Sequence, residues 1–349
     1  MKYLMHVAFL SVVISLSSVA NEITMPKTAL PPPSDTSSQF KHAITQFPVP
    51  TVEESIAATP QTVEQWRDYI QQRNADQKKK IKKMRKQFNV HVELLDIAGV
   101  TVRKITPESL SQEFKDKVYI DVHGGAYVLF GGLPSIEEGI LIAHRLGIVV
   151  LSVDYRMPPS SPAPAALHDV LAVYKDVLTS YSADNIFVGG TSAGGGLILA
   201  VTQKLIKDDI APPRALYAGT PWADLTKTGD TLFTNEGVDR ILVTYDGQLA
   251  SAAKLYASGK PLDDASISPL YGSFEGFPPT FLLTGTRDMF LSDTVRVNRK
   301  IRDAGGDTVL EIFEGMSHAD YLIAYETPES IAAYRAIKQF FSQHTASNK

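Results

Sequence analysis

Residues 186–196 read Ile-Phe-Val-Gly-Gly-Thr-Ser-Ala-Gly-Gly-Gly, an apolar run that enters a glycine-rich stretch. The apolar residues predict a buried strand, and the residues from Ala193 to Lys207 predict a helix. The string G-x-S-x-G, Gly190 to Gly194, therefore lies between a strand and a helix. Glycines are needed there because side chains would collide in so tight a turn, at whose tip the serine hydroxyl is exposed. The pattern predicts that Ser192 is a nucleophile.

Two other glycine-rich loops do not fit this stretch. A dinucleotide-binding loop requires G-x-G-x-x-G, which no register through Gly189 to Gly196 supplies. A phosphate-binding loop requires lysine after its second glycine, where Gly196 stands. An ordinary tight turn remains the alternative, so the interpretation depends on partner residues elsewhere in the chain.

Outward from this motif, short apolar strands alternate with helical stretches. We expect helices at 136–146, 165–179 and 193–207 and strands at 118–122, 148–153, 186–189 and 281–284. The alternation predicts a mostly parallel sheet covered by helices on both faces, because such strands meet water on neither face. Ligands bind these sheets at the carboxyl ends of the strands, so we expect the chemistry in the loops that follow them.

The partner residues stand in such loops. His123-Gly124-Gly125-Ala126 follows the first strand and matches the glycine loop whose backbone N–H groups complete an oxyanion hole. Asp288 follows the last strand and His318 lies in a later loop, which gives the order Ser, Asp, His. His123 is an alternative base, but we expect it to brace its loop. Asp293 is an alternative acid, for which we expect a surface role.

The composition narrows the chemistry further. The 349 residues include 34 Lys and Arg against 38 Asp and Glu, and the net charge of −4 argues against nucleic acid as a partner. The chain has no cysteine, which excludes disulfides, Cys-ligated zinc and a thiol nucleophile. Covalent chemistry must therefore come from another side chain, such as serine.

Residues 1–20 predict an export signal. Lys2 precedes an apolar stretch from Val7 to Leu16, and small residues end at Ala20, where a signal peptidase would cleave. A membrane anchor is the alternative, but the apolar run is shorter than the roughly 20 residues that a bilayer requires. We expect export to the periplasm or medium, without stable membrane insertion after cleavage.

The segment that follows is rich in Pro, Ser and Thr over residues 21–59 and predicts an arm or linker. Thr59-Pro60 then predicts the start of one long or two shorter helices, since apolar residues recur at helical spacing, at Val63, Trp66, Ile70, Ile81, Met84 and Phe88. Seven basic residues without an acid lie between Lys78 and Lys86. They favour a solvated helix face with Ile81, Met84 and Phe88 packing beneath, while a patch for anionic lipid or another polyanion is the alternative.

Several motifs in this order resemble the bacterial hormone-sensitive-lipase-like esterases and lipases of the α/β-hydrolase superfamily. The motifs that carry the resemblance are 123–126, 154–156, 162–167, 190–195, 221–225, Asp288 and 315–318. It implies an α/β-hydrolase fold over 113–349 with a helical cap, built from an N-terminal segment within 60–112 and an insertion around 222–257.

The resemblance also implies hydrolysis of carboxylic esters with short or medium acyl chains, without a cofactor, through an acyl-enzyme. By resemblance, Ser192 is the nucleophile, His318 the general base and Asp288 its orienting acid. Gly124, Gly125 and Ala193 correspond to the oxyanion-hole donors.

Some positions depart from the family pattern or have no assigned chemistry. Thr191 stands where the family more often has Asp, and Ala126 replaces a third glycine. We expect Asp154 and Arg156 to form a structural pair. Three aromatic residues flank the motifs and either line a pocket or pack in the core, namely Tyr127, Trp222 and Tyr321.

Two alternatives remain open from the sequence. The same triad hydrolyses lactones, carbohydrate acetyl esters and amides, so the bond attacked is not decided by the fold. A binding protein that has lost its chemistry is the other alternative, which is disfavoured because all three triad residues are present.

Overall fold

The computed structural model describes residues 29–46 and 48–345. The chain divides into two units, Met1–Leu30 and Pro31–Lys349, and only the second contains described helices and strands. The predicted export signal, residues 1–20, lies outside the described residues. Within the described part of the chain, every helix is too short or too polar to cross a membrane.

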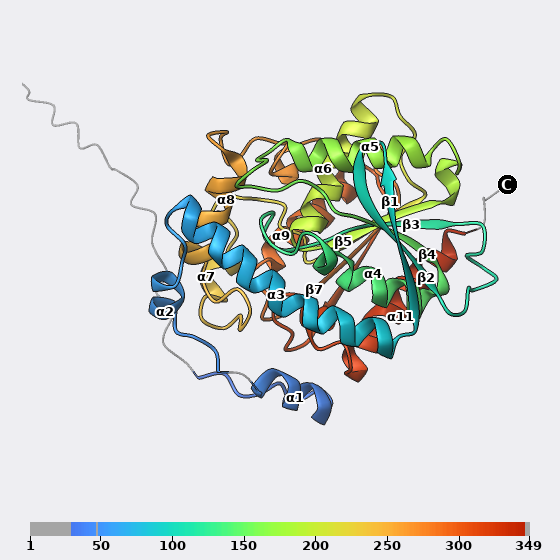
Figure 1. Ribbon diagram of the computed structural model, residues 1–349. Helices are drawn as coiled ribbons and strands as arrows, with labels where there is room; N and C mark the ends of the chain where they lie inside the picture. Colours follow the sequence, from blue (N-terminus) through green and yellow to red (C-terminus); the bar gives the residue numbers. More distant parts are fainter. Residues whose placement is uncertain (1–28, 47, 346–349) are drawn as a thin grey trace, which may run out of the picture. The chain divides into compact units, whose positions relative to one another are not determined.

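A sheet that has eight strands within the described residues forms the centre of the second unit (Figure 1), in the order β1-β2-β4-β3-β5-β6-β7-β8. Its strands are β1 (Val90–Ile97), β2 (Val100–Pro107), β3 (Val118–Val122), β4 (Val149–Val153), β5 (Ile186–Thr191), β6 (Ala215–Gly219), β7 (Thr280–Gly285) and β8 (Thr308–Phe313). The pairs β1–β2 and β2–β4 are antiparallel, and all other neighbours are parallel. The predicted mostly parallel sheet is confirmed.

Helices and helical turns connect the strands. The α-helices are α1 (Ser38–Thr45), α2 (Val52–Ala57), α3 (Val63–Gln87), α4 (Glu137–Ile142), α5 (Ala165–Val177), α6 (Ala193–Lys207), α7 (Thr231–Thr234), α8 (Ala250–Ala257), α9 (Leu291–Asp303), α10 (Asp320–Ile323) and α11 (Pro328–Gln343). Short 3₁₀ or π turns are η1 (Leu133–Ile136), η2 (Ala143–Gly147), η3 (Ala183–Asn185), η4 (Tyr245–Leu249) and η5 (Pro269–Tyr271).

The side chains of the central strands alternate between two hydrophobic cores. In β5, Ile186 and Val188 belong to the core that α5, α6 and α9 cover, whereas Phe187 belongs to the core that α4 and α11 cover. Figure 1 shows α5 and α6 on one side of the sheet and α4 and α11 on the other. This is the predicted arrangement of helices on both faces, and it explains why the strands read as continuously apolar.

The N-terminal region differs from the expectation in two respects. Residues 21–59 are not a plain arm, because α1 and α2 form there and Phe40 of α1 is fully buried. The long helix α3 begins later than Thr59-Pro60 predicts, since Thr62 is its N-cap and completes a capping box with Gln65.

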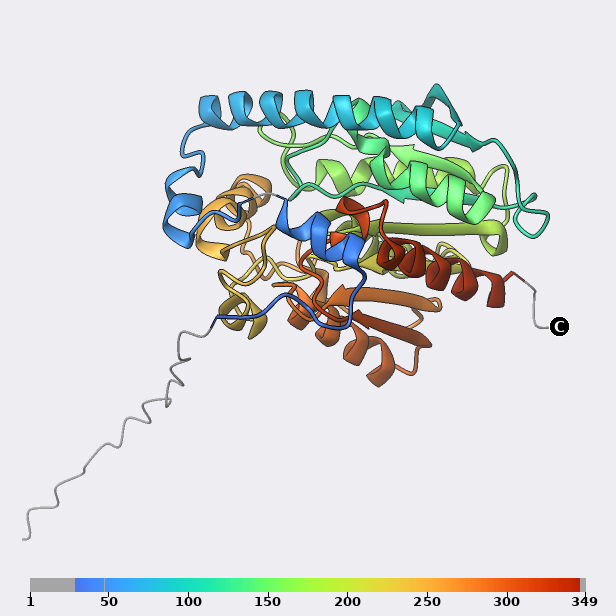
Figure 2. The same cartoon turned by 90° about the horizontal axis from the view of Figure 1, so that it is seen from below.

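Helix α2 and the start of α3 lie beside the insertion between β6 and β7. Trp66 Nε1 donates a hydrogen bond to Ser251 Oγ of α8 over 3.2 Å, and Ser251 in turn donates to the carbonyl oxygen of Pro60 over 3.0 Å. Figure 2 shows α2, drawn in blue, next to this insertion. The two segments expected to form the cap are therefore in contact.

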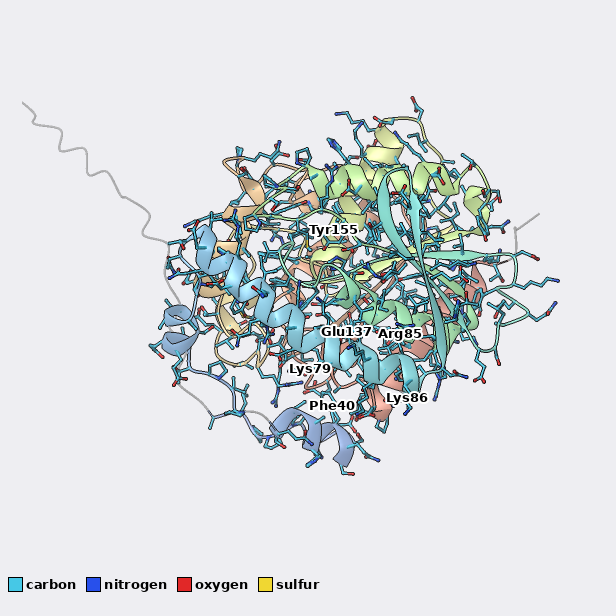
Figure 3. All side chains as sticks on the ribbon, in the orientation of Figure 1. Phe40, Lys79, Arg85, Lys86, Glu137 and Tyr155 are labelled. Atoms are coloured by element: carbon cyan, nitrogen blue, oxygen red, sulfur yellow. The ribbon has the colours of Figure 1, made fainter. Side chains whose placement is uncertain are left out.

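Most of the basic run is exposed along α3, whereas Lys80 and Arg85 are half-buried. Ile81 and Met84 are fully buried beneath it and Phe88 is half-buried, as the solvated-face interpretation predicts. Figure 3 shows Lys79 and Lys86 along this helix with Glu137 of α4 beside it, where Lys80 pairs with the Glu137 carboxylate.

Candidate active site

Ser192 lies between the end of β5 and the start of α6, in a backbone conformation that side chains rarely adopt, with φ 62° and ψ −124°. Gly190 and Gly194 face the carbonyl oxygen of Val122, and a Cβ at either position would collide with it. The local sequence therefore folds into this turn because glycine at both positions lets β3, β5 and α6 approach closely.

The structure brings the three predicted triad residues together at the carboxyl ends of β5, β7 and β8. Ser192 Oγ lies 2.9 Å from His318 Nε2, and His318 Nδ1 lies 3.2 Å from Asp288 Oδ1. Ser192 is 9% exposed, His318 4% and Asp288 0%. A hydroxyl, an imidazole and a carboxylate in this order can transfer the hydroxyl proton to the imidazole as the oxygen attacks.

Two threonines hold the acid in place. Thr284 Oγ1 donates to Asp288 Oδ2 over 2.9 Å, and Thr220 Oγ1 is hydrogen-bonded to the same oxygen. Thr220 Oγ1 also lies 3.0 Å from His318 Nδ1, so it touches both partners. Thr220 was not predicted as a site residue, because it stands at the carboxyl end of the short strand β6, which was not predicted either.

The electrostatic surroundings favour a proton on the imidazole. Burial lowers the pKa of His318, but the charge and hydrogen bond of Asp288, together with the charges of Asp239 and Asp320, outweigh it and raise the pKa above its usual value. Burial and the charge of Asp288 raise the pKa of Asp239 to about 7. Asp320 forms an ion pair with Arg240. The imidazolium formed during proton transfer would therefore be stabilised by buried carboxylates.

The predicted oxyanion-hole residues flank the serine. A Cβ on Gly124 would lie 2.8 Å from the carbonyl oxygen of Thr191 and 3.3 Å from Ser192 Cβ, so this loop touches the turn. Gly125 has a φ of +113°, which favours glycine. Ala193 is the first residue of α6, where a backbone N–H has no partner within the helix.

His123 does not lie at the serine hydroxyl. Its Nδ1 is 2.7 Å from the carbonyl oxygen of Gly124, and its ring stacks on Tyr155, whose hydroxyl donates to the His123 carbonyl oxygen over 2.8 Å. Burial lowers the pKa of His123 to about 4, so the ring is neutral and braces the glycine loop.

Two sequence expectations need correction. Asp293 is not at the surface: it is 1% exposed and accepts the backbone N–H groups of Ala223 and Asp224, which brace the insertion. Asp154 and Arg156 do not pair with each other, because Asp154 pairs with Arg103 of β2 and Arg156 pairs with Asp169 of α5. Just after the end of β4, the Asp154 side chain is directed toward β2 and the Arg156 side chain toward α5.

The three flanking aromatic residues are core residues. Tyr127, Trp222 and Tyr321 are each at most 1% exposed. The Tyr127 hydroxyl donates to the carbonyl oxygen of Trp222 over 3.0 Å.

A second buried cluster lies behind the serine turn and contains Thr191. Glu138 Oε1 accepts hydrogen bonds from Thr191 Oγ1 over 2.8 Å, from the Tyr217 hydroxyl over 3.0 Å and from the Tyr334 hydroxyl over 3.2 Å. Thr191 Oγ1 lies 2.8 Å from the Tyr321 hydroxyl. Burial raises the pKa of Glu138 to about 7. Glu138 was not predicted as a site residue, because it lies in α4, which follows β3 and not the strand that leads to Ser192.

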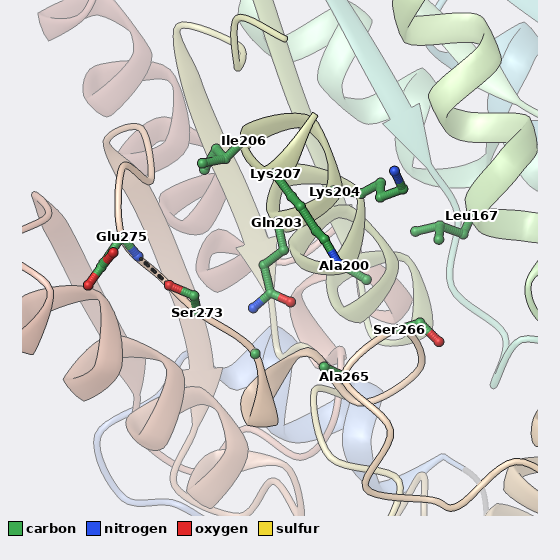
Figure 4. A pocket seen from close by; sticks show the side chains of 11 residues that line it. Leu167, Ala200, Gln203, Lys204, Ile206, Lys207, Ala265, Ser266, Ser273 and Glu275 are labelled. Atoms are coloured by element: carbon green, nitrogen blue, oxygen red, sulfur yellow. Dashed lines mark hydrogen bonds between the residues drawn. The ribbon is translucent and has the colours of Figure 1, made fainter. Parts of the chain in front are cut away.

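A pocket of about 460 Å³ lies elsewhere, along the C-terminal half of α6 and the loops at Ser266 and Ser273 (Figure 4). None of the triad or oxyanion-hole residues lines it. Among the described residues, no group of three or more His, Asp and Glu side chains could hold a metal ion.

The sheet and the arrangement at Ser192 define the class of protein as a serine hydrolase on an α/β scaffold. Residues 119–322 match a family described as having the alpha/beta hydrolase fold. The chain belongs to this family, among its hormone-sensitive-lipase-like esterases, and is a carboxylesterase-type serine hydrolase.

Individual relatives agree with this assignment. A crystal structure of an esterase named E25 is 42% identical with a TM-score of 0.90, covering 93% of this chain and 99% of that one. An esterase of the bacterial hormone-sensitive lipase family is 27% identical with a TM-score of 0.76, covering 89% of this chain and 99% of that one. An acetyl-hydrolase of Streptomyces hygroscopicus is 29% identical over 70% of this chain and 82% of its own length.

Proposed function

We propose that Ser192, His318 and Asp288 hydrolyse carboxylic esters through an acyl-enzyme intermediate. Ser192 Oγ attacks the ester carbonyl while His318 Nε2 takes its proton, and Asp288 orients the imidazole and stabilises its charged form. His318 then gives this proton to the departing alcohol. A water molecule attacks the acyl group, with His318 again taking and returning the proton, and the acid leaves. The contact of 2.9 Å between Ser192 Oγ and His318 Nε2 carries this proposal.

The oxyanion formed in both steps would be held by the backbone N–H groups of Gly124, Gly125 and Ala193. Each donor of such a hole is worth about 10² to 10³ in rate. The approach of Gly124 to Ser192 Cβ and the position of Ala193 at the start of α6 support this assignment.

The decisive experiment is Ser192→Ala with p-nitrophenyl acetate as substrate. We expect a folded protein whose kcat/KM falls at least about a thousandfold, because the nucleophile is lost. Ser180→Ala, a change of an exposed serine, is the matched control and should keep wild-type activity. Wild-type turnover by the Ser192 variant would overturn the proposal.

We further propose a preference for short to medium acyl chains. Two observations support it: Ser192 is only 9% exposed, and a methyl group, Ala126, stands in the glycine loop beside the site. A relative is named an acetyl-hydrolase. A series of p-nitrophenyl esters from acetate to palmitate tests this, with the highest kcat/KM expected at or below medium length. A rate that rises continuously toward palmitate would contradict it.

We also propose that the protein is exported after cleavage behind Ala20. The short apolar stretch and the small residues before the cleavage position support this. Expression of the full chain in a bacterium, followed by N-terminal sequencing of the periplasmic or secreted protein, should identify Asn21 as the first residue. An intact Met1 on protein found in the cytosol would contradict export.

A further inference from the structure

The segment 231–242, between β6 and β7, is bonded to both loops that carry the acid and the imidazole. Asn235 Nδ2 donates to the carbonyl oxygen of Asp288 over 2.8 Å. The backbone N–H of Arg240 donates to Ser317 Oγ over 3.2 Å. The conformation of this part of the insertion therefore affects the position of the loop that carries Asp288 and of the loop that carries His318.

One carboxylate in this segment contacts both loops at once. Asp239 is fully buried, and its Oδ2 accepts the backbone N–H of Met289, the residue after the acid, over 2.9 Å. The backbone N–H of His318 points at both oxygens, at 3.3 and 3.4 Å. The N–H groups of Ile241 and Leu242 complete the set at 2.9 and 3.1 Å. Every one of these donors is a backbone N–H, and such hydrogen bonds favour the charged carboxylate. They oppose burial and the charge of Asp288, which together raise the pKa of Asp239 to about 7, so the group is charged above that pH.

We propose that Asp239 is a positioning residue for the reaction: its carboxylate holds the main chain of Met289 and His318 at the spacing of the acid–imidazole pair, and places a second negative charge beside the imidazole. The inference rests on the proposed function, because it concerns the proton that His318 takes from Ser192. The hydrogen bonds of Asp239 go to main-chain N–H groups and not to the Ser192 hydroxyl, so it acts through Met289 and His318.

The charged groups around the imidazole show how the Asp239 carboxylate influences the pKa of His318. Asp288 faces the ring from the loop after β7, Asp239 from the insertion and Asp320 from the start of α10. Arg240 pairs with Asp320 and compensates part of its charge. Asp239 therefore contributes a negative charge that no arginine neutralises through an ion pair within the described residues.

The variant Asp239→Asn tests the proposal, because it keeps the size of the side chain and removes its charge and one acceptor. We expect kcat on p-nitrophenyl acetate to fall roughly tenfold or more, with KM within about twofold, because the substrate site is untouched. We also expect the acidic limb of kcat/KM against pH to move to lower pH by about half a unit to one unit. Removal of a neighbouring negative charge lowers the pKa of His318, so the ring stays neutral to lower pH.

Asp293→Asn is the matched control. Asp293 is also a buried aspartate that accepts two backbone N–H groups of the insertion, but its partners are Ala223 and Asp224 rather than the histidine loop. In this variant the acidic limb of kcat/KM against pH should coincide with that of the wild type, even if the melting temperature decreases. A shift of the acidic limb in Asp239→Asn but not in Asp293→Asn would distinguish a positioning role from a general contribution to the stability of the fold.

Two results would overturn the proposal. One is a folded Asp239→Asn variant with an unmoved acidic limb, whether its activity is retained or lost. The other is failure of both Asp239→Asn and the smaller Asp239→Ser to fold under conditions where Asp293→Asn folds, which would make Asp239 a general stability residue. Neither bears on the proposed function, which falls only if Ser192→Ala remains active.

Discussion

Two buried carboxyl clusters lie on either side of Ser192 and differ in their partners. The acid–imidazole cluster consists of Asp239, Asp288, His318, Asp320 and Arg240. The hydroxyl cluster consists of Glu138, Thr191, Tyr217, Tyr321 and Tyr334. The first contains a base and an arginine, whereas Glu138 of the second accepts its hydrogen bonds from hydroxyl groups alone among the described residues.

The comparison shows that burial alone does not decide what a carboxyl group does. Burial is the largest influence on the pKa of both Asp239 and Glu138, and raises each to about 7. In the acid–imidazole cluster a negative charge would stabilise the positive charge that His318 takes up in the proposed reaction. In the hydroxyl cluster the partners of Glu138 are hydroxyl groups, which do not become positively charged. A negative charge on Glu138 would therefore only destabilise the folded state, and we assign Glu138 the role of orienting Thr191 through a hydrogen bond.

The largest effect is expected from breaking the acid–imidazole cluster at its acid. Asp288→Asn keeps the shape but favours the wrong tautomer of His318, and in the well-known serine protease case this change lowers turnover about 10⁴-fold. We expect a loss of about 10³ to 10⁴ in kcat on p-nitrophenyl acetate, measured under single-turnover conditions. An activity within tenfold of wild type would show that another carboxylate, such as Asp239, can orient the ring.

A smaller effect is expected from Thr220→Val, which removes a hydroxyl that contacts both Asp288 and His318. Loss of a hydrogen bond to a charged acceptor costs about 1.5 to 3 kcal/mol. We expect kcat to fall about tenfold and the melting temperature to decrease. The control is Thr294→Val in α9, which also removes a buried hydroxyl, but one bonded to the carbonyl oxygen of Phe290. Equal losses of kcat in both variants would show that the hydrogen bonds of Thr220 to Asp288 and His318 have no specific effect on catalysis.

The smallest effect on activity is expected in the hydroxyl cluster. Glu138→Gln preserves size and the acceptor oxygen, and Oε2 has no hydrogen-bond partner in the described structure, so kcat at pH 8 should stay within about threefold. The stability of the Glu138→Gln variant, measured against pH, is a more sensitive test of this cluster than its activity. Because the folded-state pKa of about 7 lies above the ordinary value of 4.5, the wild-type carboxyl contributes stability that is fully present below pH 4.5. That stability is lost as the pH rises through about 7.

The Gln variant lacks this titration. Relative to wild type, its free energy of unfolding in urea should therefore increase between pH 5 and pH 8, by an amount on the order of 1 to 3 kcal/mol. Glu113→Gln, a change of an exposed glutamate, should give no such trend. A difference between Glu138→Gln and wild type that stays constant with pH would show that Glu138 does not titrate in this range.

Much of the fold follows from short-range patterns. The strand at 118–122 and the helix at 193–207 have the predicted bounds, because apolar runs and glycine turns mark them locally. The strands β1, β2, β6 and β8 were not identified, and neither were α9 and α11. Strand β8 has partly exposed residues, and β6 reads Ala-Leu-Tyr-Ala-Gly, without the β-branched residues that mark β3 and β4 as strands.

The three predicted triad residues, which the structure places in contact, could be selected from the sequence because each follows a motif of fixed spacing or chain order. Asp239 and Glu138 were not, since an aspartate in an irregular insertion and a glutamate in a helix carry no local mark of burial. The same reason explains the wrong expectation for Asp293, which lies in the amphipathic first turn of α9 and is buried only because the insertion packs on it.

Residue patterns alone predicted the nucleophile, in a strained turn between strand and helix, and the acid and imidazole that follow later strands. These depend on backbone sterics and residue order, which are local properties. The folded structure was needed to show which carboxylates surround the imidazole, which cluster contacts Thr191 and how the insertion between β6 and β7 is bonded to two loops. Such contacts join residues tens to hundreds of positions apart, and their strength depends on burial, which exists only after the chain has folded.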